Sequence, residues 1–323
     1  MRIHRILALL LTAALPALSL AQDQPAAQPV PAETAPQLPV VTLLEPGQAD
    51  GRRELRFAPA TGAVETMVMR MKMGMSMSMG GQEMPPSSLP AQEMTARISV
   101  DKIDENGDIH YSMEFVDAKV VADDQTPPPM KAVMDAAMSK LVGIHGKAHV
   151  SSRGITLGGK IDGGDKMDAQ SRQLLESMNQ SLQQLSSPVP EEPVGVGAKW
   201  QVVLTPRLGG FTQTVTTVYT LIALTPDSAK IDVAMSQTAA EQPLESASLP
   251  PGAKATIKTV KGSGTGSLEI AFSRITPTAS AMTTKTDVSM TFGSEGQVSE
   301  MKQTVTNELT VRGISGDSAA PSK

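Results

Sequence analysis

Seven methionines occupy every second position of one stretch of the chain, and their type and spacing suggest a binding role. They lie in "ETMVMRMKMGMSMSMGGQEM" (65–84) and are Met67, Met69, Met71, Met73, Met75, Met77 and Met79. Successive side chains of a strand point to opposite faces, so the spacing predicts that all seven thioethers share one face. A strand over these residues would span about 43 Å, so we expect Gly74 and Gly80-Gly81 to bend or end it.

An apolar role is the simplest interpretation of this face. Methionine fills irregular gaps in a core, and the sequence has only five Phe, two Tyr and one Trp for that purpose. The face would then pack against a helix that carries Met130, Met134 and Met138 at helical spacing. Alternatively, the flexible thioethers line a cavity or groove for an apolar ligand such as a lipid. The seven methionines and the three helical ones are then the ligand-facing candidates.

Copper(I) binding is a third interpretation. Thioethers are soft ligands that select this ion, and the chain has no cysteine to serve instead. A site needs several sulfurs that converge on one point, whereas alternate residues of a flat strand lie about 7 Å apart. Met73, Met75 and Met77 would therefore form a site only if the Gly- and Ser-rich segment around them bends or is a loop.

Other side chains give weaker evidence of chemistry. His145 and His149 lie four residues apart, but the sequence does not place His110 near them, so we interpret them as a surface pair. "DKIDENGD" (101–108) lacks the full spacing and the terminal Glu of a calcium loop. "GSGTGS" (262–267) lacks the Lys and the helix of a phosphate loop, and we expect it to be a flexible entry to a strand. The sequence therefore predicts no enzyme and no cofactor apart from the copper(I) alternative.

The ends of the chain predict export. A short basic region and an apolar run are typical of a signal peptide over residues 1–21, with cleavage after Ala21. Residues 22–39 are rich in Pro, Ala and Gln and predict a disordered tether, and residues 313–323 predict a disordered tail. We therefore expect a bacterial periplasmic or secreted protein with no membrane span after signal cleavage.

Charge and composition narrow the expected partners. Without the signal peptide, 26 basic and 33 acidic residues leave a net charge near −7, with no block of Lys and Arg. Nucleic acid is therefore not an expected partner. The scarcity of aromatic residues also argues against a base-stacking site. The expected partner is an apolar small molecule or lipid, or another protein of the cell envelope.

Alternation with a period of two dominates the globular region, residues 40–312, and predicts long antiparallel strands with one apolar face each. Apolar residues surround the turns "DENG" and "TPDS" at similar spacing, which suggests two related halves, 40–187 and 188–312. The predicted hairpins and the last strand cover residues 95–120, 210–240, 262–292 and 296–311.

Two segments have helical periodicity instead. Residues 127–143 begin with prolines and end with Gly143, and residues 165–185 begin at Asp165, a suitable N-cap. The sequence therefore predicts a β-rich α+β fold. Its long antiparallel strands would form a strongly curved sheet or half-barrel with two amphipathic helices.

Four features together resemble a family of exported bacterial proteins known as domain of unknown function 6263. They are the signal peptide, the hairpin turn "ENGD", the helix-bearing middle and "PEEPVGVGAKWQV" (190–202), which is similar to that family's Pro-Val-x-x-Gly-x-x-Trp element. The resemblance would cover most of residues 50–312. It implies an uncharacterised exported protein and carries over no catalytic residue.

These observations predict an exported, non-enzymatic binding protein of the cell envelope whose methionine face holds an apolar ligand such as a lipid. The alternatives are a periplasmic copper(I)-binding protein that uses the stripe from Met67 to Met79, and a structural protein that binds another envelope component.

Overall fold

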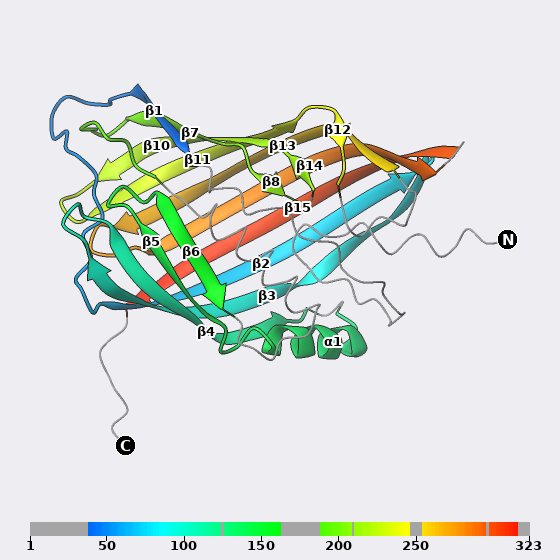
Figure 1. The fold of residues 1–323 in the computed structure, drawn as a ribbon, viewed down its shortest axis with the longest axis horizontal. Helices are drawn as coiled ribbons and strands as arrows, with labels where there is room; N and C mark the ends of the chain where they lie inside the picture. Colours follow the sequence, from blue (N-terminus) through cyan, green and yellow to red (C-terminus); the bar gives the residue numbers. More distant parts are fainter. Residues whose placement is uncertain are drawn as a thin grey trace, which may run out of the picture.

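One large antiparallel sheet makes up most of the structure (Figure 1). The computed structural model describes residues 38–123, 126–162, 188–208, 210–245, 254–294 and 297–315. Its elements are β1 (Val40–Glu45), β2 (Val64–Met79), β3 (Gln82–Ile103), β4 (Ile109–Val121), α1 (Pro128–Ser139), β5 (His145–Val150), β6 (Thr156–Asp162), β7 (Lys199–Leu204), β8 (Arg207–Leu208), β9 (Phe211–Thr212), β10 (Thr214–Leu224), β11 (Ser228–Ala239), β12 (Gln242–Pro243), β13 (Lys254–Ala271), β14 (Ala279–Ser294) and β15 (Gln297–Ser315).

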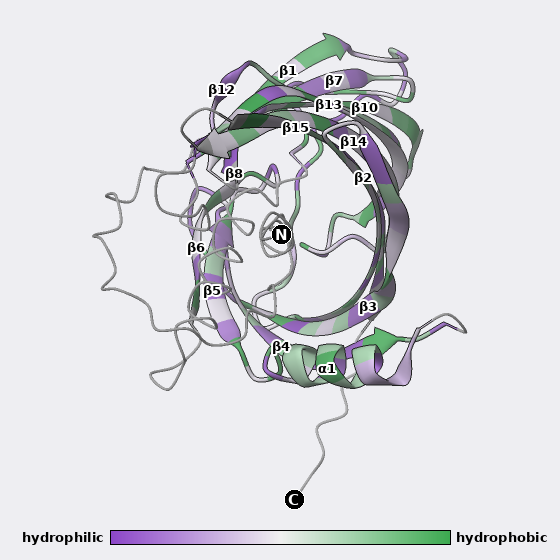
Figure 2. Ribbon diagram, turned by 90° about the vertical axis from the view of Figure 1, so that its right-hand side faces the viewer, coloured by the Kyte–Doolittle hydropathy of each residue, from purple (hydrophilic) through white to green (hydrophobic). Residues whose placement is uncertain are grey.

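Neighbouring strands are mostly joined by hairpins. The order across the 13-stranded sheet is β1-β7-β10-β11-β13-β14-β15-β2-β3-β4-β5-β6, with β12 paired to β13, and β8 and β9 form a separate two-stranded sheet. Seen end-on, the large sheet curves so strongly that β6 and the β1–β7 edge come round toward each other (Figure 2). β1 and β6 are therefore the two edges of a highly curved sheet.

The strand register shows which side of the sheet is concave. Val100 of β3 packs in one cluster with Trp200 and Leu268, which come from strands across the curve. Directly paired residues share a face. One row of such pairs joins Trp200 to the methionine strand and runs through Trp200, Tyr219, Val233, Gly266, Met282, Leu309 and Met71. The methionines of β2 therefore lie on the concave side.

The predicted α+β class is wrong, because the described chain is nearly all β. Strands hold 66% of it and helix 5%, so helices do not form a layer of the fold. The prediction of long antiparallel strands had counted two amphipathic helices as part of the architecture, whereas the described residues contain one short helix. The strands hold most of the described residues, and β3 alone extends over 22 of them.

The helix α1 is the one helix within the described residues, and it is shorter than predicted. It was expected over residues 127–143 and ends at Ser139. Residues Lys140 to Gly143 form turns, and Gly143 has a φ of 84°, a conformation that favours glycine and ends a helix. The second predicted helix, over residues 165–185, lies outside the described residues.

The hairpin of β2 and β3 is longer than the sequence suggested. Gly80 and Gly81 have φ values of 57° and 83° and form its turn, as expected. Gly74, in contrast, lies inside β2, where an added Cβ would approach the Thr306 side chain to 2.7 Å. The register between β2 and β3 shifts twice, after Met71 and after Met75. The opposing parts of β3 contain its prolines, which cannot donate a ladder hydrogen bond and are tolerated at such irregularities.

The buried side chains form three clusters. The largest contains Leu55 and Trp200 and fills one end of the concave side. The second joins Met138 of α1 and Leu141 to Ala118 and other residues of β3 to β6. The third surrounds Met290 and Met301, which lie at the end of β14 and β15 away from the first cluster. Between the ends of the long strands, the concave side has fewer buried residues, and this is where the methionine face lies.

Candidate functional site

All seven methionines of the predicted stripe lie on β2, and every one of them is half-buried. Arg70, Lys72 and Ser76, which alternate with them, are exposed on the other face. Met67 packs against the second buried cluster and Met77 against the third. The predicted shared face is therefore present, but its side chains are not enclosed as those of a filled core would be.

The middle of this face is uncharged. The row across the sheet at Met73 contains Asn307, Thr284, Gly264, Met235 and Thr217. The row at Met75 contains Val305, Thr286, Gly262, Gln237 and Val215. The charged residues of the same strands alternate with these and lie on the convex side. The concave middle is thus a band of thioethers, neutral polar groups and glycines.

Neutral polar groups in this band contact one another and the methionines. The Gln303 amide donates to the Met75 sulfur at 2.8 Å, and the Thr286 hydroxyl donates to the Gln237 amide oxygen at 2.9 Å. The Oδ1 atom of Asn307 is buried and has no hydrogen-bond partner within the described structure. A buried carbonyl oxygen without a donor is costly, so Asn307 offers an acceptor to any donor that enters the band.

The glycines of "GSGTGS" belong to this band as well. The expected flexible entry is wrong, because residues 262–267 lie inside β13. An added Cβ on Gly264 would lie 2.7 Å from the Thr284 side chain, and one on Gly266 would lie 2.2 Å from the Ala281 carbonyl oxygen. Backbone and side-chain atoms of β14 therefore occupy the space beside these glycines.

One end of the concave side is closed around Trp200. The Trp200 ring stacks on Tyr219 with centroids 5.4 Å apart, and its Nε1 donates to the Pro188 carbonyl at 2.9 Å. Trp200 and Leu55 are 1% and 0% exposed. This is the tryptophan of the "PEEPVGVGAKWQV" element, which therefore serves to seal the sheet at this end.

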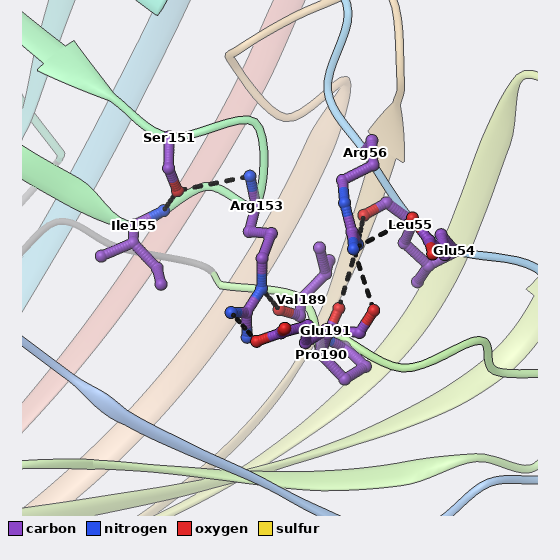
Figure 3. Close-up of polar contacts among 9 residues, drawn as sticks. All are labelled: Glu54, Leu55, Arg56, Ser151, Arg153, Ile155, Val189, Pro190 and Glu191. Atoms are coloured by element: carbon purple, nitrogen blue, oxygen red, sulfur yellow. Dashed lines mark hydrogen bonds and ion pairs between the residues drawn. The ribbon is translucent and has the colours of Figure 1, made fainter. Parts of the chain in front are cut away.

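Two arginines hold the segment that closes this end (Figure 3). Arg153 donates from Nε to the Val189 carbonyl and from Nη1 to the Glu191 carboxylate, both at 3.2 Å. Arg56 donates to the Pro190 carbonyl at 3.2 Å and to the Glu191 carbonyl at 2.9 Å. Four hydrogen bonds from these two arginines thus fix a segment that has little secondary structure of its own.

The three helical methionines do not form one buried stripe. Met138 is 5% exposed and belongs to the second cluster, and Met134 packs against that cluster. Met130 is 42% exposed. Met67 and Met94 also pack against this cluster, but α1 itself packs mainly against β4 and not along the methionine strand.

The three methionines named for copper(I) follow one another on one strand. Their partners on β15 are Asn307, Val305 and Gln303, and their partners on β3 are Leu89, Ser87 and Met84. Of these three, only Met77 therefore has a methionine directly opposite on either neighbouring strand. Copper(I) binding by Met73, Met75 and Met77 stays a prediction, with spacing along the strand as its main difficulty.

The histidines are closer than the sequence indicated. His110 of β4 pairs with His149 of β5, and their rings stack with centroids 5.1 Å apart. His110 Nε2 also contacts the Asp104 carboxylate at 2.6 Å, whereas His145 lies opposite Glu114. Within the described residues, no group of three His, Cys, Asp or Glu side chains is arranged to hold a metal ion.

Two open hollows lie mainly on the convex side. One, of about 470 Å³, is lined by residues that include Val218, Thr220 and Asp232. The other, of about 410 Å³, includes Ser76 and Thr304. Their linings are mostly small or polar, so neither offers the apolar site that the sequence predicted.

The neutral polar partners of the methionines were not predicted from the sequence. Gln303 and Asn307 stand at alternate positions of the predicted strand 296–311, so its apolar face could have been extended to include them. Gln303 lies opposite Met77, and Asn307 lies opposite Met73, because β15 pairs with β2. That pairing joins residues more than 200 positions apart and has no local signal.

The fold and this face define a nearly all-β protein built on one curved antiparallel sheet with a methionine-lined concave side. The model of a family of unknown function, DUF6263, matches residues 174–274, which confirms the resemblance to this family over that segment and not over most of residues 50–312. The matched segment includes the sealing element and the strands β7 to β11. It identifies no activity.

Other comparisons add little. A search of curated proteins finds no match to the chain. Among solved structures, the crystal structure of Pseudomonas aeruginosa OpdQ matches with 6% identity and covers 78% of this chain and 97% of that one. Its TM-score is 0.18, which carries no argument about fold or function. Within the described part of the chain, the helical structure does not reach the length and hydropathy that a membrane crossing requires.

Proposed function

We propose that the protein is an exported, non-enzymatic binding protein of the cell envelope and that its methionine face holds an apolar ligand such as a lipid. The observation that supports this most is the burial of the stripe. All seven side chains are half-buried on the concave side, between ends where other side chains are fully buried. A filled core would bury them, and an ordinary surface would not gather them on one face.

The lining suggests which lipids would bind. Apolar rows at Met69 and Met71, which include Val311 and Leu309, lie on one side of the neutral polar band. Apolar residues at the Met77 row, such as Val288, lie on the other side. A ligand with apolar chains and one uncharged donor would match this pattern, because Asn307 Oδ1 needs a donor. A charged head group would lose its hydration without gaining a partner in the band.

The test compares two lysine substitutions at adjacent positions of β2. Met75→Lys places a charge on the concave face, and Ser76→Lys places the same charge on the exposed convex face. The purified proteins are examined by native mass spectrometry for co-purified lipid and are then titrated with dioctanoylglycerol, a neutral lipid with one free hydroxyl. We expect Met75→Lys to weaken binding by at least about tenfold and Ser76→Lys to bind as the unchanged protein does.

Two controls make the test specific. Met75→Leu keeps an apolar side chain and should retain binding, while thermal unfolding of all three variants shows whether the fold persists. The 3-acetyl ester of dioctanoylglycerol lacks the hydroxyl donor and should bind more weakly, and octanoate should bind least. Equal behaviour of Met75→Lys and Ser76→Lys, or no lipid bound by the unchanged protein, would contradict the proposal and favour a structural role.

A further inference from the structure

The strand register gathers five methionines from four strands. Met79 of β2 lies opposite Met301 of β15, and Met301 lies opposite Met290 of β14. On the other side of β2, Met77 lies opposite Met84 of β3. All five lie on the concave face near the β2–β3 turn, and we refer to them as the methionine cluster.

Spacing across strands favours convergence of these sulfurs. Directly opposite residues have Cβ atoms about 4.5–5.5 Å apart, whereas alternate residues of one strand lie about 7 Å apart. The register between β2 and β3 also shifts between Met75 and Met77, opposite Pro85 and Pro86. Such an irregularity bends a strand and redirects its side chains. Thioethers from four strands can therefore approach one point, which three successive methionines of a single strand cannot.

The cluster combines buried methionines, which are shielded from water, with half-buried ones, which an ion can reach. Met301 and Met290 are 1% and 6% exposed and pack with Ile257 and Leu244. Met77, Met79 and Met84 are only half-buried, so an ion could reach their sulfurs from the concave side. An apolar surrounding without charged groups disfavours a strongly hydrated divalent ion, which needs oxygen ligands.

We propose that the methionine cluster binds a soft monovalent metal ion, copper(I) or silver(I). Thioethers are soft, neutral ligands, and they select such ions over harder ones. Met79, Met84 and Met301 come from three different strands and supply the converging sulfurs, with Met77 and Met290 beside them. This proposal shares Met77 and Met79 with the face proposed for the apolar ligand, but it uses neither Asn307 nor the neutral band in the middle of β2.

The test uses silver(I), which binds thioethers as copper(I) does but does not change oxidation state. The purified protein is titrated with silver(I) in a nitrate buffer, and bound metal is counted by native mass spectrometry. The variant carries Met79→Leu and Met84→Leu together, and the matched control carries Met113→Leu and Met282→Leu, two half-buried methionines outside the cluster. Leucine approximates the volume of methionine, so neither pair should unfold the protein.

We expect one silver ion per chain in the unchanged protein and in the control, and an affinity lower by about tenfold or more in the cluster variant. Methyl-labelled methionine spectra provide a second measurement, in which the ε-methyl signals of Met79, Met84 and Met301 should shift on adding silver(I). The proposal is overturned if the unchanged protein binds no silver ion, or if the cluster variant and the control bind it equally. Shifts confined to Met69, Met71 and Met73 would also overturn it.

Discussion

The concave side of the sheet has two regions that share the same strands but differ in burial. At the closed end, Trp200, Leu221 and Ile231 are at most 1% exposed. In the middle, the residues of β10, β11, β13, β14 and β15 that share a row with Met73 or Met75 are all half-buried. Both regions show the same alternation along each strand, so alternation alone does not determine which part of the face is filled.

The difference comes from what lies against each region. The closed end receives Leu55, Phe57, Val189 and Val194 from two segments that precede β2 and β7. The middle receives no comparable apolar group within the described residues, and its own side chains are smaller or polar. A curved sheet of this length therefore needs separate segments to fill its concave side, and the parts that the described residues leave unfilled are where binding can occur.

The largest expected effect comes from a substitution in the filled, closed end. Trp200→Ala removes a buried ring and leaves the Pro188 carbonyl without its donor, so we expect a loss of about 3–5 kcal/mol in the free energy of unfolding. Met73→Ala should cost only about 1 kcal/mol, because Met73 is half-buried. Urea unfolding of both variants measures the difference. A cost for Met73→Ala as large as that for Trp200→Ala would mean that the methionine face is core.

A second prediction concerns a buried charge at the beginning of the methionine strand. Glu65 is 4% exposed and accepts hydrogen bonds from the Ile275 and Thr276 amides, each at 3.0 Å, and from the Thr276 hydroxyl. Its Oε2 lies 3.6 Å from Arg274 Nε. Removing one partner leaves buried polar groups unpaired, so Glu65→Ala should cost about 3 kcal/mol in urea unfolding.

Glu65→Gln provides the control for this prediction. Glutamine keeps one acceptor oxygen and nearly the same volume, so it should cost clearly less than alanine. If both substitutions have the same small cost, Glu65 does not fasten β2 to the segment after β13.

Much of the sheet could be predicted from the sequence, because its hairpins are local. Asn106-Gly107 marks the turn between β3 and β4, where Gly107 has a φ of 85°. The shared face of the seven methionines also followed from alternation. Helix content was overestimated. A proline and a glycine at suitable spacing indicate where a helix begins and ends, but they do not indicate how much of the fold is helical.

The candidate sites depended on pairings that leave no local trace. The pairing of β15 with β2 places Met301 beside Met79 and Asn307 beside Met73. No property of either strand alone specifies that partner. The degree of burial also depends on segments such as Pro188–Glu191, which two distant arginines hold in place. These features require the assembled structure.

A smaller effect concerns the rate at which individual methionines are oxidised, which should depend on their burial. Hydrogen peroxide converts accessible thioethers to sulfoxides, so Met73 and Met75 should oxidise before Met301 and Met290, which are 1% and 6% exposed. Peptide mass spectrometry after a short exposure gives the order. Simultaneous oxidation of all four would indicate that the two regions of the face do not differ in accessibility. Bound dioctanoylglycerol should slow the oxidation of Met73 and Met75.

The smallest expected effect concerns pH and the attachment of α1. Lys131 and the Val120 amide, which donates at 2.9 Å, hold the pKa of Asp135 below its ordinary value. A carboxyl whose pKa is lowered by folding contributes stability above its unfolded pKa, and this contribution disappears as the pH falls through the folded pKa. Protection of the Val120 amide against hydrogen exchange should therefore decrease below about pH 4. Asp135→Asn should lack this dependence, whereas protection of the Leu221 amide, in the closed end, should not change in either protein.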